Sequence, residues 1–137
     1  MSARQMEKKM QFINPPGAPK PTSFYSQGVL VSANAKRLVI SGQVGVAPDG
    51  TIRQGMRAQT EQVFSNMKAV LNAAGMDFAD VIKVVIYCTR PDETGPVREI
   101  RAAMFGSHTP TSTFLMVPAL ANPEFLIEIE AEAVKEA

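Results

Sequence analysis

Cysteine, histidine and tryptophan are nearly missing from this sequence. Its 137 residues include one Cys, one His and no Trp. A single cysteine excludes an intrachain disulfide, so a reducing, cytoplasmic environment is the natural one. Cys88 lies inside the apolar run VIKVVIYC and is expected in the core, where thiols are inert. His108 stands shortly before Pro110 and is expected to be a loop residue, so the sequence predicts no metal site.

An excess of charge of one sign is missing as well. The 14 Lys and Arg residues nearly balance the 13 Asp and Glu residues, which leaves a net charge of +1. No broad positive field is therefore available to bind nucleic acid by counterion release. No apolar run approaches the roughly 18 residues of a membrane span, and the start MSARQMEKKMQF has no secretory apolar stretch. We expect a soluble cytoplasmic protein with neither nucleic-acid nor membrane partners.

Motifs that bind cofactors are absent from the sequence too. No P-loop, G-x-G-x-x-G, H-E-x-x-H or G-x-S-x-G pattern occurs, so no cofactor is expected. What is present is ordinary for a globular protein, with 45% hydrophobic and 20% charged residues. The length fits one domain over residues 1–137, of which 1–13 form a polar leader.

The apolar patterns predict five strands and two helices in the order β-β-α-β-α-β-β. We expect the strands over about 28–33, 37–46, 80–89, 112–117 and 125–134. We expect the helices from Met56 to a cap at Gly75, and over about 95–105. The first two strands are expected to form a hairpin, and the third to be buried on both sides. A single mixed sheet with both helices on one face would bury both helical stripes, which is an α+β fold.

The last strand carries a row of carboxylates. In LIEIEAEAV the glutamates alternate with apolar residues, so Glu128, Glu130 and Glu132 project from one face. Such a row must be solvated, paired with cations or functional. On an edge strand it commonly marks a solvated face that prevents edge pairing.

Three further polar positions interrupt otherwise apolar segments. Tyr25 ends a proline-rich run, and Ser41 and Gly42 follow the strand residues LVI. A Tyr hydroxyl can donate or accept a hydrogen bond, and a Gly lets the backbone approach a ligand. The alternatives are that Tyr25 caps an edge of the core and that Gly42 is a β-bulge.

Three stretches of the chain match one known family in order, spacing and composition. They are NPPGAPKPTSFYSQG, LVISGQVGV and PTSTFLMVPALANPEFLIEIEAEAV. By them the chain resembles the RidA (YjgF, or L-PSP) family over nearly its whole length. The resemblance implies a chorismate-mutase-like α+β fold, assembled as a homotrimer with small-molecule clefts between subunits. Members with assigned activity hydrolyse reactive enamines and imines to a keto acid and ammonia without a cofactor.

The resemblance also implies roles for individual residues of this chain. Tyr25 matches the family's tyrosine, Ser41 and Gly42 its cleft floor, and Glu128 the glutamate that positions water. By this mapping Glu130 and Glu132 are structural or solvated.

One position departs from the pattern of deaminating members. Ser112 stands where those members carry an arginine that binds the substrate carboxylate through two hydrogen bonds. Losing that pair should cost at least roughly tenfold in affinity for an α-imino acid. Phe114, on the same strand face, makes this wall apolar. The chain therefore resembles an arginine-lacking branch, whose ligand is neutral, differently charged or larger.

A cation from a neighbouring element could replace the missing one. Arg90, Arg98 and Arg101 lie on the following loop and helix. The resemblance implies that Arg98 is the substrate-binding residue among them, because it falls near where the family often has an asparagine facing the cleft. The alternative is a solvated Arg98 that pairs locally with Asp92 or Glu99.

Three classes of function follow from these features. The first is an enzyme that hydrolyses a small C=N compound, with Glu128 and Tyr25 catalytic and altered specificity at Ser112. The second is a homotrimer that binds a metabolite without turning it over. A ribonuclease or translation inhibitor is the third, disfavoured by the near-zero net charge and the single His. Self-association is also expected because one sheet face, thought to include Phe114 and Met116, needs cover.

Overall fold

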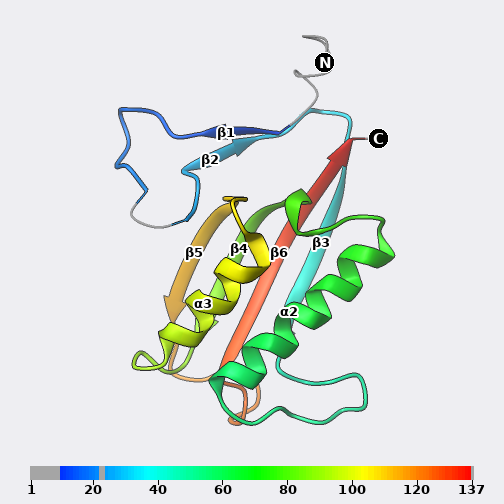
Figure 1. The fold of residues 1–137 in the computed structure, drawn as a ribbon, viewed down its shortest axis with the longest axis vertical. Helices are drawn as coiled ribbons and strands as arrows, with labels where there is room; N and C mark the ends of the chain where they lie inside the picture. The colour runs from blue at the N-terminus through cyan, green and yellow to red at the C-terminus, as the bar shows by residue number, and fades with distance from the viewer. Residues whose placement is uncertain (1–9, 22–23, 137) are drawn as a thin grey trace.

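A four-stranded mixed sheet forms the centre of the computed structural model, which describes residues 10–21 and 24–136 (Figure 1). In spatial order its strands are β3 (Ala35–Val44), β6 (Ile127–Glu136), β4 (Val81–Cys88) and β5 (Thr111–Met116). β4 and β5 are parallel, and the other neighbours are antiparallel. The helices α2 (Met56–Ala73) and α3 (Thr94–Phe105) lie side by side on one face of this sheet. The predicted α+β fold is confirmed.

A separate two-stranded sheet lies beyond one end of the main sheet (Figure 1). It pairs β1 (Gln11–Ile13) with β2 (Gly28–Leu30). The predicted hairpin of the first two strands is therefore wrong, because β2 pairs with β1 while β3 pairs with β6. The two ends of the proline-rich run meet, because the Gln27 N–H donates to the Asn14 Oδ1 at 2.8 Å. The three residues of β1 are too few to give a periodic signal, and residues 1–9 of the predicted leader lie outside the described residues.

The longer helix, α2, follows the predicted apolar stripe and ends as expected. Val63, Phe64, Met67 and Leu71 are fully or almost fully buried against the sheet. Gly75 has a φ of 69°, a left-handed conformation that Gly adopts without the penalty of a Cβ atom. There the chain reverses, with the Gly75 N–H bonded to the Asn72 carbonyl at 3.0 Å. The predicted cap is confirmed. After α2, a short 3₁₀ helix, η1 (Phe78–Asp80), leads into β4.

The two faces of the main sheet differ because residues alternate along each strand. On β4, Val84, Ile86 and Cys88 are buried under the helices, whereas Val85 and Tyr87 are only partly buried. The expectation that β4 is buried on both sides is therefore wrong for the single chain, although Cys88 lies in the core as predicted. We call the sheet face opposite the helices the open face.

The open face carries apolar side chains in contact with solvent. Val39 of β3 is 67% exposed and Leu115 of β5 is 42% exposed. Phe114 does not lie there, contrary to expectation, because it pairs in register with the core residue Ile86 and packs against the core. The same parity assigns Met116 to the helical side, in register with Cys88. The need for cover on the open face remains, but Leu115 supplies the apolar surface on β5.

A buried glutamine ties α2 to the segment that enters β6. The side chain of Gln59 donates to the carbonyls of Arg53 at 3.0 Å and Glu124 at 2.9 Å. It also accepts from the Leu126 N–H at 2.8 Å. A Cβ atom at Gly45 would lie 2.6 Å from the Gln59 Cβ, so glycine permits this close approach. The amide thus fixes the chain two residues before Glu128.

Gln59→Met should destabilise the protein while keeping the volume of the side chain. The change removes the side-chain partner of two carbonyls and one N–H in part-buried hydrogen bonds, and a fully buried unsatisfied group would cost about 1–3 kcal/mol. We expect the free energy of unfolding, measured by urea denaturation at fixed protein concentration, to fall by at least about 2 kcal/mol. Gln54→Met, at an exposed position, is the control and should change it by less than about 0.5 kcal/mol. Equal stability of the two variants would contradict this role of Gln59.

Candidate functional site

A β-bulge in β3 brings the backbone of Gly42 against Glu128. The pairing of β3 with β6 shifts register between Ile40 and Gln43, which leaves Ser41 and Gly42 in the bulge. A Cβ atom built at Gly42 would lie 2.7 Å from the Glu128 Cδ and 2.9 Å from its Oε2. The carboxylate therefore rests directly on the bare glycine backbone. The structure thus brings Gly42 and Glu128 together, with Ser41 next to Gly42 in the bulge.

The three carboxylates of β6 have different surroundings. Tyr87 donates its hydroxyl to the Glu130 Oε1 at 2.6 Å, and this hydrogen bond is the main cause that raises the pKa of Tyr87. Glu132 forms an ion pair with Arg37 at 2.7 Å. Within the described part of the chain, Glu128 has no hydrogen bond or ion pair through its side chain. Of this row, Glu128 is the half-buried carboxylate left available to a water or a ligand.

Tyr25 lies far from Glu128 within one chain. The next residue, Ser26, is bound to the start of β5 through the Pro110 carbonyl at 3.2 Å. Glu128 instead pairs with Tyr87, which pairs with Leu115 near the other end of β5. The strand rise alone separates the two levels by roughly 15 Å, and two strand spacings add about 10 Å across the sheet. A single chain therefore does not bring the predicted catalytic pair together.

The predicted binding residues Ser112, Phe114 and Arg98 do come together, beside α3. Ser112 and Phe114 share the helical side of β5, and the Arg98 Cζ lies 5.3 Å from the centre of the Phe114 ring. The predicted alternative for Arg98 is not found with Glu99, because Glu99 pairs with Arg57 at 2.7 Å. Arg98 is therefore held by stacking on the Phe114 ring and not by an ion pair with Glu99.

Arg101, not Arg98, is the cation that contacts Ser112. Its Nη1 donates to the Ser112 Oγ at 2.7 Å, and its Nη2 donates to the Phe24 carbonyl at 3.3 Å. Burial lowers the pKa of Arg101, and the nearby charge of Arg98 lowers it further. Sequence reasoning placed Arg98 nearest the cleft. Arg98 and Arg101 are three residues apart, and this spacing, which puts both arginines on one side of a helix, is the signal that could have indicated Arg101.

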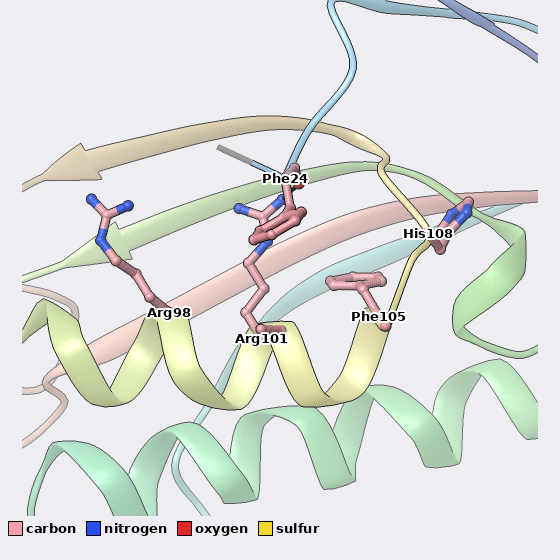
Figure 2. A pocket seen from close by; sticks show the side chains of 7 residues that line it. Phe24, Arg98, Arg101, Phe105 and His108 are labelled. Carbon is pink, nitrogen blue, oxygen red and sulfur yellow. Dashed lines mark hydrogen bonds between the residues drawn. The ribbon is translucent and has the colours of Figure 1, made fainter. Parts of the chain in front are cut away.

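A pocket of about 240 Å³ lies beside these arginines. Figure 2 shows Arg98 and Arg101 extending from the same side of α3, with the Phe24 ring above Arg101 and Phe105 at the helix end. The His108 Nε2 donates to the Val81 carbonyl at 2.6 Å, which anchors this loop residue to the start of β4. His108 also packs against the rings of Phe12 and Phe105.

The candidate residues thus form two groups on opposite sides of the sheet. Ser41, Gly42 and Glu128 belong to the first, at the bulge. The second consists of Ser112, Phe114, Arg98 and Arg101, between β5 and α3. Because the sheet separates them, they can act on one ligand only if a second copy of the chain supplies one group. Over residues 10–21 and 24–136 there is no cluster of metal-ligating side chains, and no helix there is long and apolar enough to cross a membrane.

Known proteins resemble this chain over most of its length. The family model described as Endoribonuclease L-PSP matches residues 16–135. A RutC family protein of Pyrococcus horikoshii is 40% identical over 121 residues, covering 87% of this chain and 93% of its own. The human 2-iminobutanoate/2-iminopropanoate deaminase is 35% identical over 122 residues, covering 88% and 84%.

The solved structures agree with the sequence relatives. A Yersinia pestis protein of the conserved Rid family, of unknown function, superposes with a TM-score of 0.80 at 34% identity, covering 90% of this chain and 97% of its own. The family model and these relatives support the resemblance that the three sequence stretches indicated. The chain belongs to the Endoribonuclease L-PSP family, which is the RidA (YjgF) family.

Proposed function

We propose that this protein hydrolyses small imines or enamines without a cofactor, at a cleft between subunits. The observation that carries the proposal is the Glu128 carboxylate, which is half-buried and seated on the bare backbone of Gly42. Its neighbours in the row are engaged with Tyr87 and Arg37. Relatives named 2-iminobutanoate/2-iminopropanoate deaminase support this reaction class.

Glu128 acts as the base that positions the attacking water. The water oxygen adds to the carbon of a protonated imine, the C=N electron pair moves to nitrogen, and Glu128 takes one water proton. The nitrogen of the resulting carbinolamine then takes that proton and leaves as ammonia. A hydroxyl lone pair forms the C=O bond, and the hydroxyl proton passes to the released ammonia. An enamine enters the same route once its carbon is protonated.

A second copy of the chain completes the cleft in this proposal. Tyr25 and the group beside Ser112 lie too far from Glu128 within one chain. The open face exposes Val39 and Leu115, and symmetric self-association is the common way to cover such a surface. In the homotrimer we propose, the bulge of one subunit faces the β5–α3 edge of the next, with the Tyr25 hydroxyl as a hydrogen-bonding partner of the substrate.

Metabolite binding without turnover is the second candidate, and Ser112 is the observation that favours it. The strand arginine of deaminating members is absent at this position, while the Glu128 seat and the pocket at α3 are retained. Ribonuclease activity, which the description of the family model names, has less support. The single His is bonded to the Val81 carbonyl, and the net charge of +1 offers little attraction to RNA.

Glu128→Gln should abolish most turnover without disturbing the fold, because the amide keeps the shape and cannot accept the proton. A positioned base contributes roughly 10²- to 10⁴-fold, so we expect kcat to fall within that range. The assay follows ammonia released from an imine generated in place by an amino-acid oxidase. Glu132→Gln, in the same row, removes an exposed ion pair and should lose less than about fivefold. Wild-type protein that binds imines or their keto acids but releases no ammonia would favour the binding function.

Gly42→Ala should displace the Glu128 carboxylate and reduce turnover while the protein remains folded. The added Cβ would clash with the flexible end of a side chain, which can move, and not with backbone. We expect kcat/KM to fall at least tenfold, with the melting temperature within a few degrees of wild type. Gly28→Ala is the matched control, since its Cβ would meet only the Ile13 Cβ at 3.8 Å. Full activity of Gly42→Ala would exclude the proposed seat of the base.

Val39→Asp should break the proposed assembly and with it the cleft. A carboxylate on the open face would become buried and unpaired between subunits, which is strongly unfavourable. Light scattering should give three times the chain mass of 14.8 kDa for wild type and a smaller mass for the variant, with turnover lost in parallel. Leu30→Asp, on the exposed β2, is the control and should stay trimeric. A wild-type monomer that is active at micromolar concentration would contradict the inter-subunit cleft.

A further inference from the structure

Tyr25 lies in a segment that is bonded to the rest of the fold on both sides of it. Before it, the Phe24 carbonyl accepts from the Arg101 Nη2 at 3.3 Å. After it, the Ser26 N–H donates to the Pro110 carbonyl at 3.2 Å. Among the residues that the structure describes, none forms a hydrogen bond with the Tyr25 hydroxyl. The place of the phenol is therefore set by its neighbours along the chain, and its hydroxyl is available to a ligand.

Ser26 follows Tyr25 directly and is buried, with 2% of its surface exposed. Its hydroxyl donates to the Thr109 carbonyl at 2.7 Å and lies 3.1 Å from the Thr109 Oγ1. We call these two contacts the Ser26 anchor. A serine is rarely buried so completely, and water competes little for hydrogen bonds in such a place. The Ser26 anchor therefore holds the segment more tightly than an exposed contact would.

The Ser26 anchor ends on a short segment, residues 108–111, that is itself tied to β4. The His108 Nε2 donates to the Val81 carbonyl at 2.6 Å. The Thr111 hydroxyl donates to the Ile82 carbonyl at 2.8 Å. Both carbonyls belong to the first two residues of β4, a strand that is paired on both sides. The segment that carries the phenol is thus connected to the main sheet.

We propose that Ser26 is a positioning residue, whose hydroxyl holds the segment at residues 24–27 against the start of β5 and so fixes where Tyr25 enters the cleft. The inference rests on the proposed function, in which the Tyr25 hydroxyl is a hydrogen-bonding partner of the substrate. Such a group helps the reaction when it is in place before the substrate arrives. Tyr25 lies outside the strands, so Ser26 provides for it the fixation that strand pairing provides for Glu128.

The first test is whether Ser26 acts through Tyr25. Ser26→Ala should lower kcat for imine hydrolysis by roughly threefold to tenfold, the loss that a hydrogen bond of ordinary strength allows. In a Tyr25→Phe background, which lacks the hydroxyl to be positioned, the same change should cost less than about twofold. Ser32→Ala is the matched control, because the Ser32 hydroxyl donates to the exposed Glu136, and it should keep wild-type turnover. An equal loss in both backgrounds would overturn the inference.

Fluorescence tests the position of the phenol without any turnover. The sequence has two Tyr and no Trp, so Tyr87→Phe leaves Tyr25 as the dominant emitter. In this background the decay of fluorescence anisotropy reports nanosecond motion of the Tyr25 ring. Ser26→Ala should increase the fast component of the decay, whereas Ser32→Ala should leave it unchanged. The Ser26 anchor lies within one chain, so this measurement does not depend on assembly. An unchanged decay in Ser26→Ala would overturn the inference.

The outcomes distinguish this inference from the proposed function. A faster decay in Ser26→Ala, in a protein that releases no ammonia, would support the Ser26 anchor and remove the function. Turnover that is lost in Glu128→Gln but unchanged in Ser26→Ala would do the reverse.

A second variant keeps the test decisive should Ser26→Ala not fold. Thr109→Val removes one hydroxyl of the Ser26 anchor and leaves the carbonyl acceptor in place. It should increase the fast component of the anisotropy decay as well, by less than Ser26→Ala would. An unchanged decay in Thr109→Val would then overturn the inference.

Discussion

The alternation of residues along β6 is the constraint on which the rest of this structure depends. β6 is bonded to β3 on one side and β4 on the other, so its two faces cannot exchange. Ile127 and Ile129 enter the core beneath the helices, and a shift of one residue would bury the glutamates there instead. The cost of burying unpaired carboxylates therefore fixes the register, and with it the place of Glu128.

The fixed register becomes a site because β3 departs from regular pairing. The bulge at Ser41 and Gly42 lets the backbone approach the Glu128 carboxylate, which a side chain would prevent. Gln59 supports the same place from the other layer by holding the chain that enters β6. Local packing thus gives Glu128 different surroundings from the two other glutamates on the same face of β6. Glu130 and Glu132 are occupied by partners on adjacent strands.

The positive charge beside Ser112 comes from Arg101 on α3, and not from the strand β5 on which deaminating members carry their arginine. A short hydroxyl on β5 and a long side chain on α3 meet there, so the positive charge lies next to Ser112 without being attached to its strand. Two stacked contacts, of Arg98 on Phe114 and of Arg101 on Phe105, direct both guanidinium groups toward the same pocket. Loss of an arginine from one position therefore does not mean loss of positive charge from the site.

Patterns along the chain were enough to predict the α+β class, the end of α2 at Gly75, the face of β6 that carries Glu128, and the family. These follow from periodicity, glycine conformation and matching stretches, all of which are local along the chain. The folded chain was needed to show that β2 pairs with β1, that Phe114 faces the helices and that Arg101 contacts Ser112. Strand partners, the parity of an edge strand and the reach of a side chain depend on which segments meet in space, and no local pattern encodes that.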